Sequence, residues 1–196
     1  MFHCLYLSKR GSKLIPKYSA ANFIHHYFDF RRDLILHLAF PSSIVIVDIN
    51  SVREIGGFDE QFIGHGYEDF DFMLRLFQHK GLIEYSADIL VDEPYLAPLM
   101  SVGLRTVLAK PFLESLIQPV YFLHKFHKKD KEESYYKKRD LNKKLFINKY
   151  QKLKKYQFHF NKLTLLNSFF TEVIEEKNSP KYVVLWAEIK GYILRQ

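Results

Sequence analysis

Glycines divide the stretch between Gly56 and Gly81 into a turn, a loop and one helix. This spacing of glycines constrains the fold more than any other feature of the sequence. Gly64 and Gly66 favour a loop that a ligand can approach closely, because glycine permits positive φ and has no side chain. The helix is expected to begin at Glu68. Its apolar residues have the i, i+3, i+4, i+7 spacing of one helix face: Phe70, Met73, Leu74 and Phe77.

Local patterns predict further short strands and helices. The expected elements are strands at 2–7, 43–47 and 82–90, and helices at 19–28, 51–54 and 181–194. The helix at 51–54 has the capping-box spacing of Ser51 and Glu54. The apolar segment 99–123 contains three charged residues, which favours a core or interfacial helix pair over a membrane span.

The composition is that of a globular protein. The chain has 196 residues, of which 47% are hydrophobic and 16% are aromatic, and this argues against disorder. Cys4 is the only cysteine, which excludes a disulfide framework and a cysteine-based zinc site. The first ten residues lack the pattern of a signal peptide, so a reducing cytoplasmic location is the expectation.

The positive charge is concentrated in one segment. Residues 124–160 contain 13 basic and 4 acidic residues, whereas the remainder of the chain has a net charge of −2. A solvated lysine-rich helix explains this pattern, and so does attraction to an anionic membrane surface or to phosphate-bearing ligands. Nucleic acid is the least favoured partner, because no recognised nucleic-acid-binding motif accompanies the aromatic residues among the lysines.

Three carboxylates, Glu68, Asp69 and Asp71, lie within four positions at the junction of the glycine-spaced loop and the helix. One interpretation is that they only stabilise the helix N-terminus, where the macrodipole favours negative charge. The other is that one of them is a general base that deprotonates a hydroxyl nucleophile held against the loop. The local pattern leaves both interpretations open.

The segment from Gly56 to Phe62, followed by Gly64–Leu76, resembles the acceptor-side signature of GT-A glycosyltransferases. The resemblance is to family 2 enzymes of bacterial capsule biosynthesis, to chondroitin-type polymerases and to animal β-1,4-galactosyltransferases. It covers roughly residues 1–150 and is strongest over 42–78. It implies an α/β fold, namely the C-terminal, acceptor-side part of a GT-A fold with added C-terminal helices. The implied activity is inverting transfer of a sugar from a nucleotide-sugar, such as a UDP-sugar, to a growing capsular or surface polysaccharide.

The resemblance also assigns roles to residues. Asp69 would be the catalytic base, and Glu68 would orient the acceptor glycan through its hydroxyl groups. The other implied acceptor-binding residues are Gly64, His65, Gly66, Tyr67 and Asp71. By helical spacing, Arg75 is expected to pair with Asp71. The family implies Mn²⁺ or Mg²⁺ near the donor diphosphate. A histidine in this region often completes the metal site in the resembled family, so His127 or His124 is the implied ligand. Histidines three apart can share one helix face, so their spacing permits ligation.

A nucleotide-binding half of the GT-A fold is not seen before the acceptor signature, and the only Asp-x-Asp sequence, Asp69-Phe70-Asp71, belongs to that signature. The expectation is therefore a fragment that pairs with a separate donor-binding half, divided into an acceptor-side part (1–98), a helical extension (99–160) and a C-terminal tail (161–196). The implied location is peripheral, at the cytoplasmic face of the inner membrane. The alternative functions are a non-catalytic sugar-binding or scaffold module and a binder of nucleic acid or anionic surfaces that acts through residues 124–160.

Overall fold

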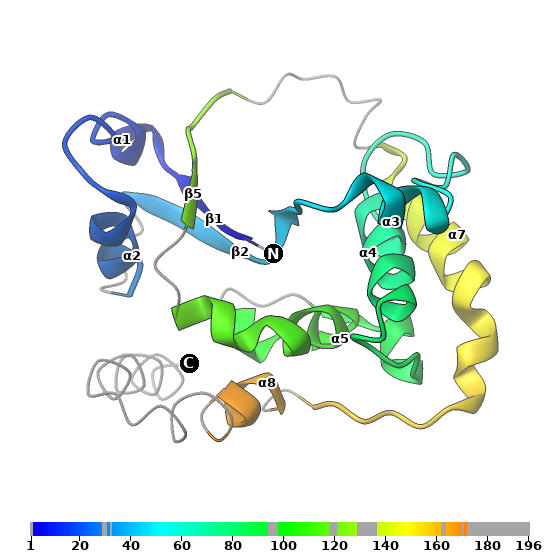
Figure 1. Ribbon diagram of the computed structural model, residues 1–196. Coiled ribbons are helices and arrows are strands. Elements are labelled where there is room, and N and C mark those ends of the chain that lie inside the picture. The colour runs from blue at the N-terminus through cyan, green and yellow to red at the C-terminus, as the bar shows by residue number, and fades with distance from the viewer. Residues whose placement is uncertain are drawn as a thin grey trace. The chain divides into compact units, whose positions relative to one another are not determined.

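The computed structural model describes residues 2–28, 31, 33–93, 98–117, 121–128, 137–161, 164–169 and 171 (Figure 1). These residues form a mixed α/β structure, as predicted. Contacts divide them into two compact units. Unit 1 comprises the described residues within 1–44, 112–128 and 165–196, and unit 2 those within 45–111 and 129–164. The division into segments 1–98, 99–160 and 161–196 stays a prediction.

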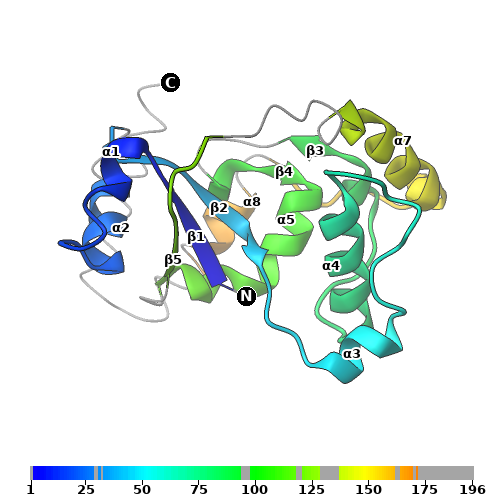
Figure 2. The same cartoon turned by 90° about the horizontal axis from the view of Figure 1, so that it is seen from above.

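Unit 1 is built on a three-stranded sheet with the order β2-β1-β5. The central strand β1 (Phe2–Leu7) pairs antiparallel with β2 (Ile35–Ile44) and parallel with β5 (Tyr121–His124). A short helix, α1 (Lys9–Ser12), follows β1, and α2 (Ala20–Phe28) lies beside the sheet (Figure 2). Side chains alternate between the two faces of a strand. One face therefore packs with α2 in an apolar core formed by Leu5, Leu7, Phe23, Tyr27, Leu34, Ile35 and Leu38.

Unit 2 consists mainly of helices. They are α3 (Ile49–Glu54), α4 (Glu68–His79), α5 (Leu104–Ala109), α7 (Arg139–Tyr150) and the 3₁₀ helices η1 (Ala87–Leu90), η2 (Pro98–Met100) and η4 (Gln151–Lys155). A small antiparallel sheet joins β3 (Asp92–Glu93) to β4 (Val102–Gly103). The remaining described elements are η3 (Lys110–Ile117) and α8 (Thr164–Ser168). None of the helices in the described parts of the chain is long and apolar enough to cross a membrane.

The structure confirms several local predictions. The strand at Phe2–Leu7 and the helix that ends at Phe28 are present, and α4 begins at Glu68 as predicted. The predicted stripe on α4 is buried, except for the half-buried Phe70. The segment 104–117 is helical, as expected of the apolar stretch, whereas β5 in the same stretch was not predicted. The predicted helix at 181–194 lies outside the described residues.

Two predicted strands are wrong, and one predicted helix begins earlier than expected. The expected buried strand at 43–47 is only the end of β2, because the last residue pair with β1 joins Ile44 to Phe2, and Ile46 is 73% exposed. The expected strand at 82–90 does not form, because residues 82–86 have no regular secondary structure and residues 87–90 form η1. The helix at 51–54 starts two residues earlier, because the carboxylate of Asp48, and not Ser51, accepts the capping hydrogen bond.

Candidate functional site

The loop before α4 holds an unusual backbone conformation at its last residue. Tyr67 precedes the first residue of α4 and has a φ of 71°, in the left-handed region that residues with side chains rarely adopt. Its phenol is buried and donates a hydrogen bond to Asp92 Oδ2 over 3.1 Å. Burial and the adjacent Asp92 carboxylate raise the pKa of Tyr67, so the phenol stays protonated. The Tyr67 side chain thus fixes the point at which the loop becomes helix.

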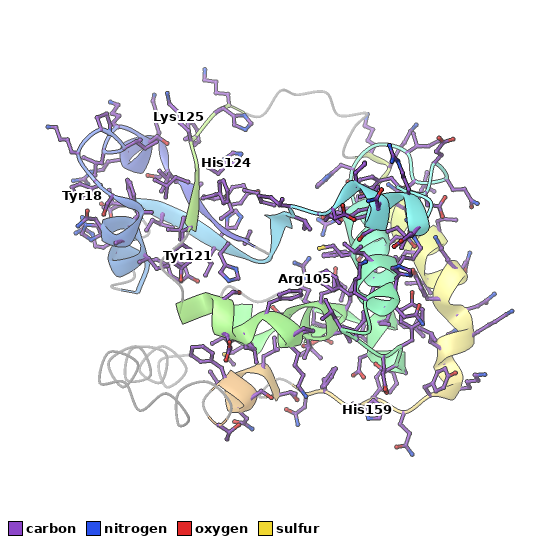
Figure 3. The ribbon with its side chains drawn as sticks, in the orientation of Figure 1. Tyr18, Arg105, Tyr121, His124, Lys125 and His159 are labelled. Carbon is purple, nitrogen blue, oxygen red and sulfur yellow. The ribbon has the colours of Figure 1, made fainter. Side chains whose placement is uncertain are left out.

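A second layer of contacts holds Asp92 itself. The Arg105 Nε atom donates to Asp92 Oδ1 over 2.6 Å, and the guanidinium lies 5.0 Å from the centre of the Phe70 ring. Arg105 projects from α5 (Figure 3). Sequence reasoning missed Asp92 and Arg105, because both lie far along the chain from the loop and no local motif marks them.

The lysine-rich helix α7 supports the same loop with its inner face. Gly66 has a φ of 108°, and a Cβ atom there would lie 2.8 Å from Cγ of Arg139. Asn142 Nδ2 donates to the carbonyl of Ile63 over 3.2 Å, and the Phe146 ring lies 5.3 Å from that of Tyr67. Arg139 was missed in the sequence, although its i, i+3, i+7 spacing with Asn142 and Phe146 is the signal of a contacting helix face.

Asp69, the predicted base, is half-buried in the first turn of α4. Its Oδ1 atom accepts a hydrogen bond from the backbone N–H of Phe70 over 2.9 Å. Burial raises the pKa of the Asp69 carboxyl, and the negative charge of Glu68 raises it further. A carboxylate with a raised pKa is a stronger base once it is ionised.

Glu68 and His65 lie together at the loop. Glu68 Oε1 lies 3.7 Å from His65 Nδ1, whereas Glu68 Oε2 is shielded from solvent and has no hydrogen-bond partner among the described residues. Because a shielded carboxylate oxygen without a donor is unfavourable, this atom is well suited to accept a hydrogen bond from a ligand hydroxyl.

Asp71 occupies a different environment from its two acidic neighbours. Its side chain is fully buried, with Oδ2 2.8 Å from Arg75 Nε and Oδ1 2.7 Å from Lys149 Nζ. The Tyr150 hydroxyl also donates to Oδ1, over 2.9 Å. The predicted Arg75–Asp71 pair is therefore confirmed. These contacts give Asp71 a structural role, and its predicted contact with an acceptor stays a prediction.

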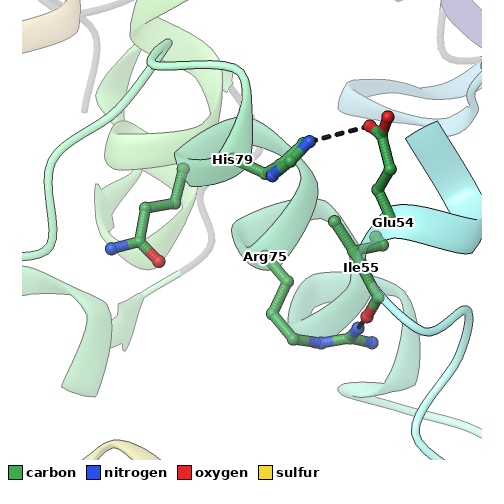
Figure 4. Close-up of a pocket in the computed structure, with 5 residues that line it drawn as sticks. Glu54, Ile55, Arg75 and His79 are labelled. Atoms are coloured by element: carbon green, nitrogen blue, oxygen red, sulfur yellow. Dashed lines mark hydrogen bonds and ion pairs between the residues drawn. The ribbon is translucent and has the colours of Figure 1, made fainter.

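Arg75 extends this network to α3. Its two terminal nitrogens donate to the carbonyls of Ile55 and Gly57, over 2.6 and 2.7 Å, and so hold the turn that ends α3. Figure 4 shows the open pocket beside this contact, where His79 Nε2 lies 2.9 Å from Glu54 Oε2. None of the predicted acceptor-binding residues lines this pocket.

His124 and His127 belong to unit 1, whereas the acidic loop belongs to unit 2. The two histidines do not share a helix face, because His124 ends strand β5 and no helix joins the two residues. Their rings are nevertheless 5.2 Å apart, and the ring of His124, which is labelled in Figure 3, stacks on that of Tyr6. The described residues contain no group of three or more His, Cys, Asp or Glu side chains placed to hold a metal ion. Metal binding by either histidine stays a prediction.

The comparisons with known proteins identify the family. The model of the family described as "Glycosyltransferase like family 2" matches residues 12–155, which is well over half of the chain and includes the loop, α4 and α7. No curated protein and no solved structure gives a significant match. The length of the family match shows that this chain belongs to the glycosyltransferase-like family 2.

Proposed function

We propose that the loop and first turn of α4 form the acceptor side of an inverting glycosyltransferase site in which Asp69 is the general base. The donor is a nucleotide-sugar, with a UDP-sugar as the first candidate, and the acceptor is a growing capsular or surface glycan. Membership of the family supports glycosyl transfer in general. The choice of a capsular glycan rests on the resemblance of residues 56–76 to capsule enzymes.

The contrast between Asp69 and Asp71 carries the assignment of the base. Asp71 is fully buried and bound by Arg75, Lys149 and Tyr150, so its lone pairs are already engaged. Asp69 accepts only a local backbone hydrogen bond among the contacts described above, and burial raises its pKa. Of the two, Asp69 is therefore the carboxylate able to accept a proton from a bound hydroxyl.

The proposed reaction is a single displacement. The acceptor hydroxyl oxygen forms a bond to the anomeric carbon while the bond from that carbon to the diphosphate oxygen breaks. The hydroxyl proton moves to the Asp69 carboxylate, and the nucleoside diphosphate leaves with the electron pair. Attack from the side opposite the leaving group inverts the configuration. In this proposal Glu68 Oε2, which has no hydrogen-bond partner among the described residues, accepts a hydrogen bond from a second hydroxyl of the acceptor.

A divalent cation, Mn²⁺ or Mg²⁺, belongs to the proposal through the family resemblance. It would neutralise charge on the departing diphosphate. Within the described residues the candidate ligands amount to the His124–His127 pair, which does not make a complete coordination set. No step of the reaction is therefore assigned to these histidines.

The test is acceptor-dependent release of nucleoside diphosphate by the purified chain. A panel of UDP-sugars is incubated with Mn²⁺ and glycan acceptors, and acceptor binding is followed separately by ligand-observed NMR, which requires no donor. We expect acceptor binding and at least one donor that gives acceptor-dependent release. Acceptor binding without release from any donor would instead support the non-catalytic sugar-binding module.

A further inference from the structure

The segment that follows α7 combines lysines and aromatic side chains on the surface of unit 2. We call residues 152–158 the anchor segment. Lys152, Lys154 and Lys155 in η4 are exposed, whereas Leu153 between them is buried. The aromatic side chains of Tyr156 and Phe158 follow, with exposed fractions of 47% and 64%. Three cationic groups therefore adjoin two large exposed rings within seven residues.

A buried carboxylate fixes the backbone just after this segment. Asp88 in η1 is 1% exposed, and its two oxygens accept hydrogen bonds from the backbone N–H groups of His159 and Phe160, over 2.9 and 3.1 Å. The Ser86 hydroxyl also donates to Asp88 Oδ2, over 2.8 Å. His159 lies on the extended stretch that leaves η4 (Figure 3). Asp88 and the buried Leu153 thus tie the anchor segment to unit 2 at both ends, and the two rings remain exposed between these ties.

Two lysines lie close to aromatic rings in and beside the anchor segment. Lys155 Nζ lies 5.2 Å from the centre of the Tyr156 ring, and Lys110 Nζ lies 5.6 Å from that of Phe160. Aromatic rings beside lysines are typical of protein surfaces that contact the interface of a bilayer, where the rings enter the headgroup region and the ammonium groups meet anionic lipids.

We propose that the anchor segment docks unit 2 onto an anionic lipid bilayer, with Phe158 and Tyr156 entering the interface and the three lysines contacting lipid phosphates. Charge complementarity supports a bilayer, and so does the exposed apolar surface of Phe158, which a purely polar partner would leave in water. Nucleic acid is disfavoured because no recognised nucleic-acid-binding motif accompanies these lysines and aromatic residues. The proposal is independent of the sugar-transfer chemistry proposed above.

The experiment measures binding of the full chain to vesicles by sedimentation. One set of vesicles contains phosphatidylcholine alone, and the other contains phosphatidylcholine with about a third phosphatidylglycerol. We expect binding to the anionic vesicles only. Combined replacement of Lys152, Lys154 and Lys155 by Gln should lower the partition coefficient about a hundredfold. This total is the product of three smaller factors, one from each lysine near the surface.

The matched control removes the same charge from α7 and the turn before it. Lys137, Lys138 and Lys143 are also exposed, and their combined replacement by Gln should change binding by no more than about threefold if contact is made through the anchor segment. Replacement of the three anchor lysines by Arg should preserve binding. Phe158→Ala should weaken binding about tenfold through loss of the inserted ring.

The outcomes separate the proposal from its competitors. Equal losses in the two glutamine variants, or equal binding to neutral and anionic vesicles, would overturn it. Tighter binding to a single-stranded RNA than to anionic vesicles, with the same dependence on the anchor lysines, would assign the segment to nucleic acid instead. Thermal unfolding of each variant verifies folding, which these exposed substitutions should leave intact.

Discussion

Asparagine at position 69 is expected to lower the rate constant of sugar transfer by a factor of about 10² to 10⁴. Asparagine keeps the shape of the side chain but cannot accept the proton of the attacking hydroxyl. The affinity for the acceptor glycan should change little, because Glu68 and the loop remain. The measurement is kcat and acceptor KM for the wild-type chain and Asp69→Asn, with Asp140→Asn on the exposed start of α7 as the matched control.

The same variant is expected to keep or gain stability. Burial raises the pKa of Asp69 in the folded chain, so folding disfavours the ionised carboxyl, and its ionisation costs stability as the pH rises towards neutrality. Asparagine removes this cost. Thermal unfolding should therefore show a Tm at pH 7.5 equal to or above that of the wild-type chain, with a smaller difference at pH 4. A lower Tm combined with lost activity would point to a structural role for Asp69.

The Asp71→Ala variant is expected to lose much of its stability, whereas Asp69→Asn is expected to keep or gain stability. Removal of one member of a buried charged network costs about 3 kcal/mol, because the remaining groups lose a charged partner that solvent does not replace. Here Arg75, Lys149 and the Tyr150 hydroxyl would all lose the Asp71 carboxylate. Unfolding in urea measures the loss.

A second aspartate in an ion-pair network provides the control for Asp71→Ala. Asp33 also bonds two cationic side chains, Arg10 and Arg31, but on the exposed surface of unit 1. Asp33→Ala should therefore cause a much smaller loss of stability, because solvent already screens these charges. Equal losses for the two alanine variants would contradict the structural role given to Asp71. Asp71→Asn should fall between the wild-type chain and Asp71→Ala, because the amide oxygen still accepts hydrogen bonds.

Local interactions govern the features of the candidate site that could be predicted from the sequence. The start of α4 at Glu68 and the pair of Arg75 with Asp71 follow from helical spacing and need no knowledge of distant residues. The family resemblance of residues 56–76 likewise came from one continuous stretch, and the family match agrees with it.

The features that could not be predicted depend on distant partners. The apolar run at 43–47 has strong β propensity, but β1 supplies its last pairing residue opposite Ile44, so Val45 and Ile46 do not extend the strand. The predicted strand at 82–90 gives way to an irregular stretch followed by η1, where Asp88 binds backbone groups some 70 residues further on. In the same way, only the folded chain shows that Asp92 and Arg105 fix Tyr67.

The pH dependence of kcat/KM for the acceptor tests the central claim, that a half-buried Asp69 carboxylate is the base. Activity requires the ionised form, so kcat/KM should fall on the acid side with a single ionisation whose pKa is above the ordinary aspartate value of about 3.9. His65 lies beside the carboxylates and is replaced to test whether it causes this ionisation. The His65→Gln variant should keep the ionisation, because the account assigns it to Asp69. An acid limb that disappears in His65→Gln, or a kcat/KM that stays constant down to the pH of unfolding, would contradict the assignment of Asp69.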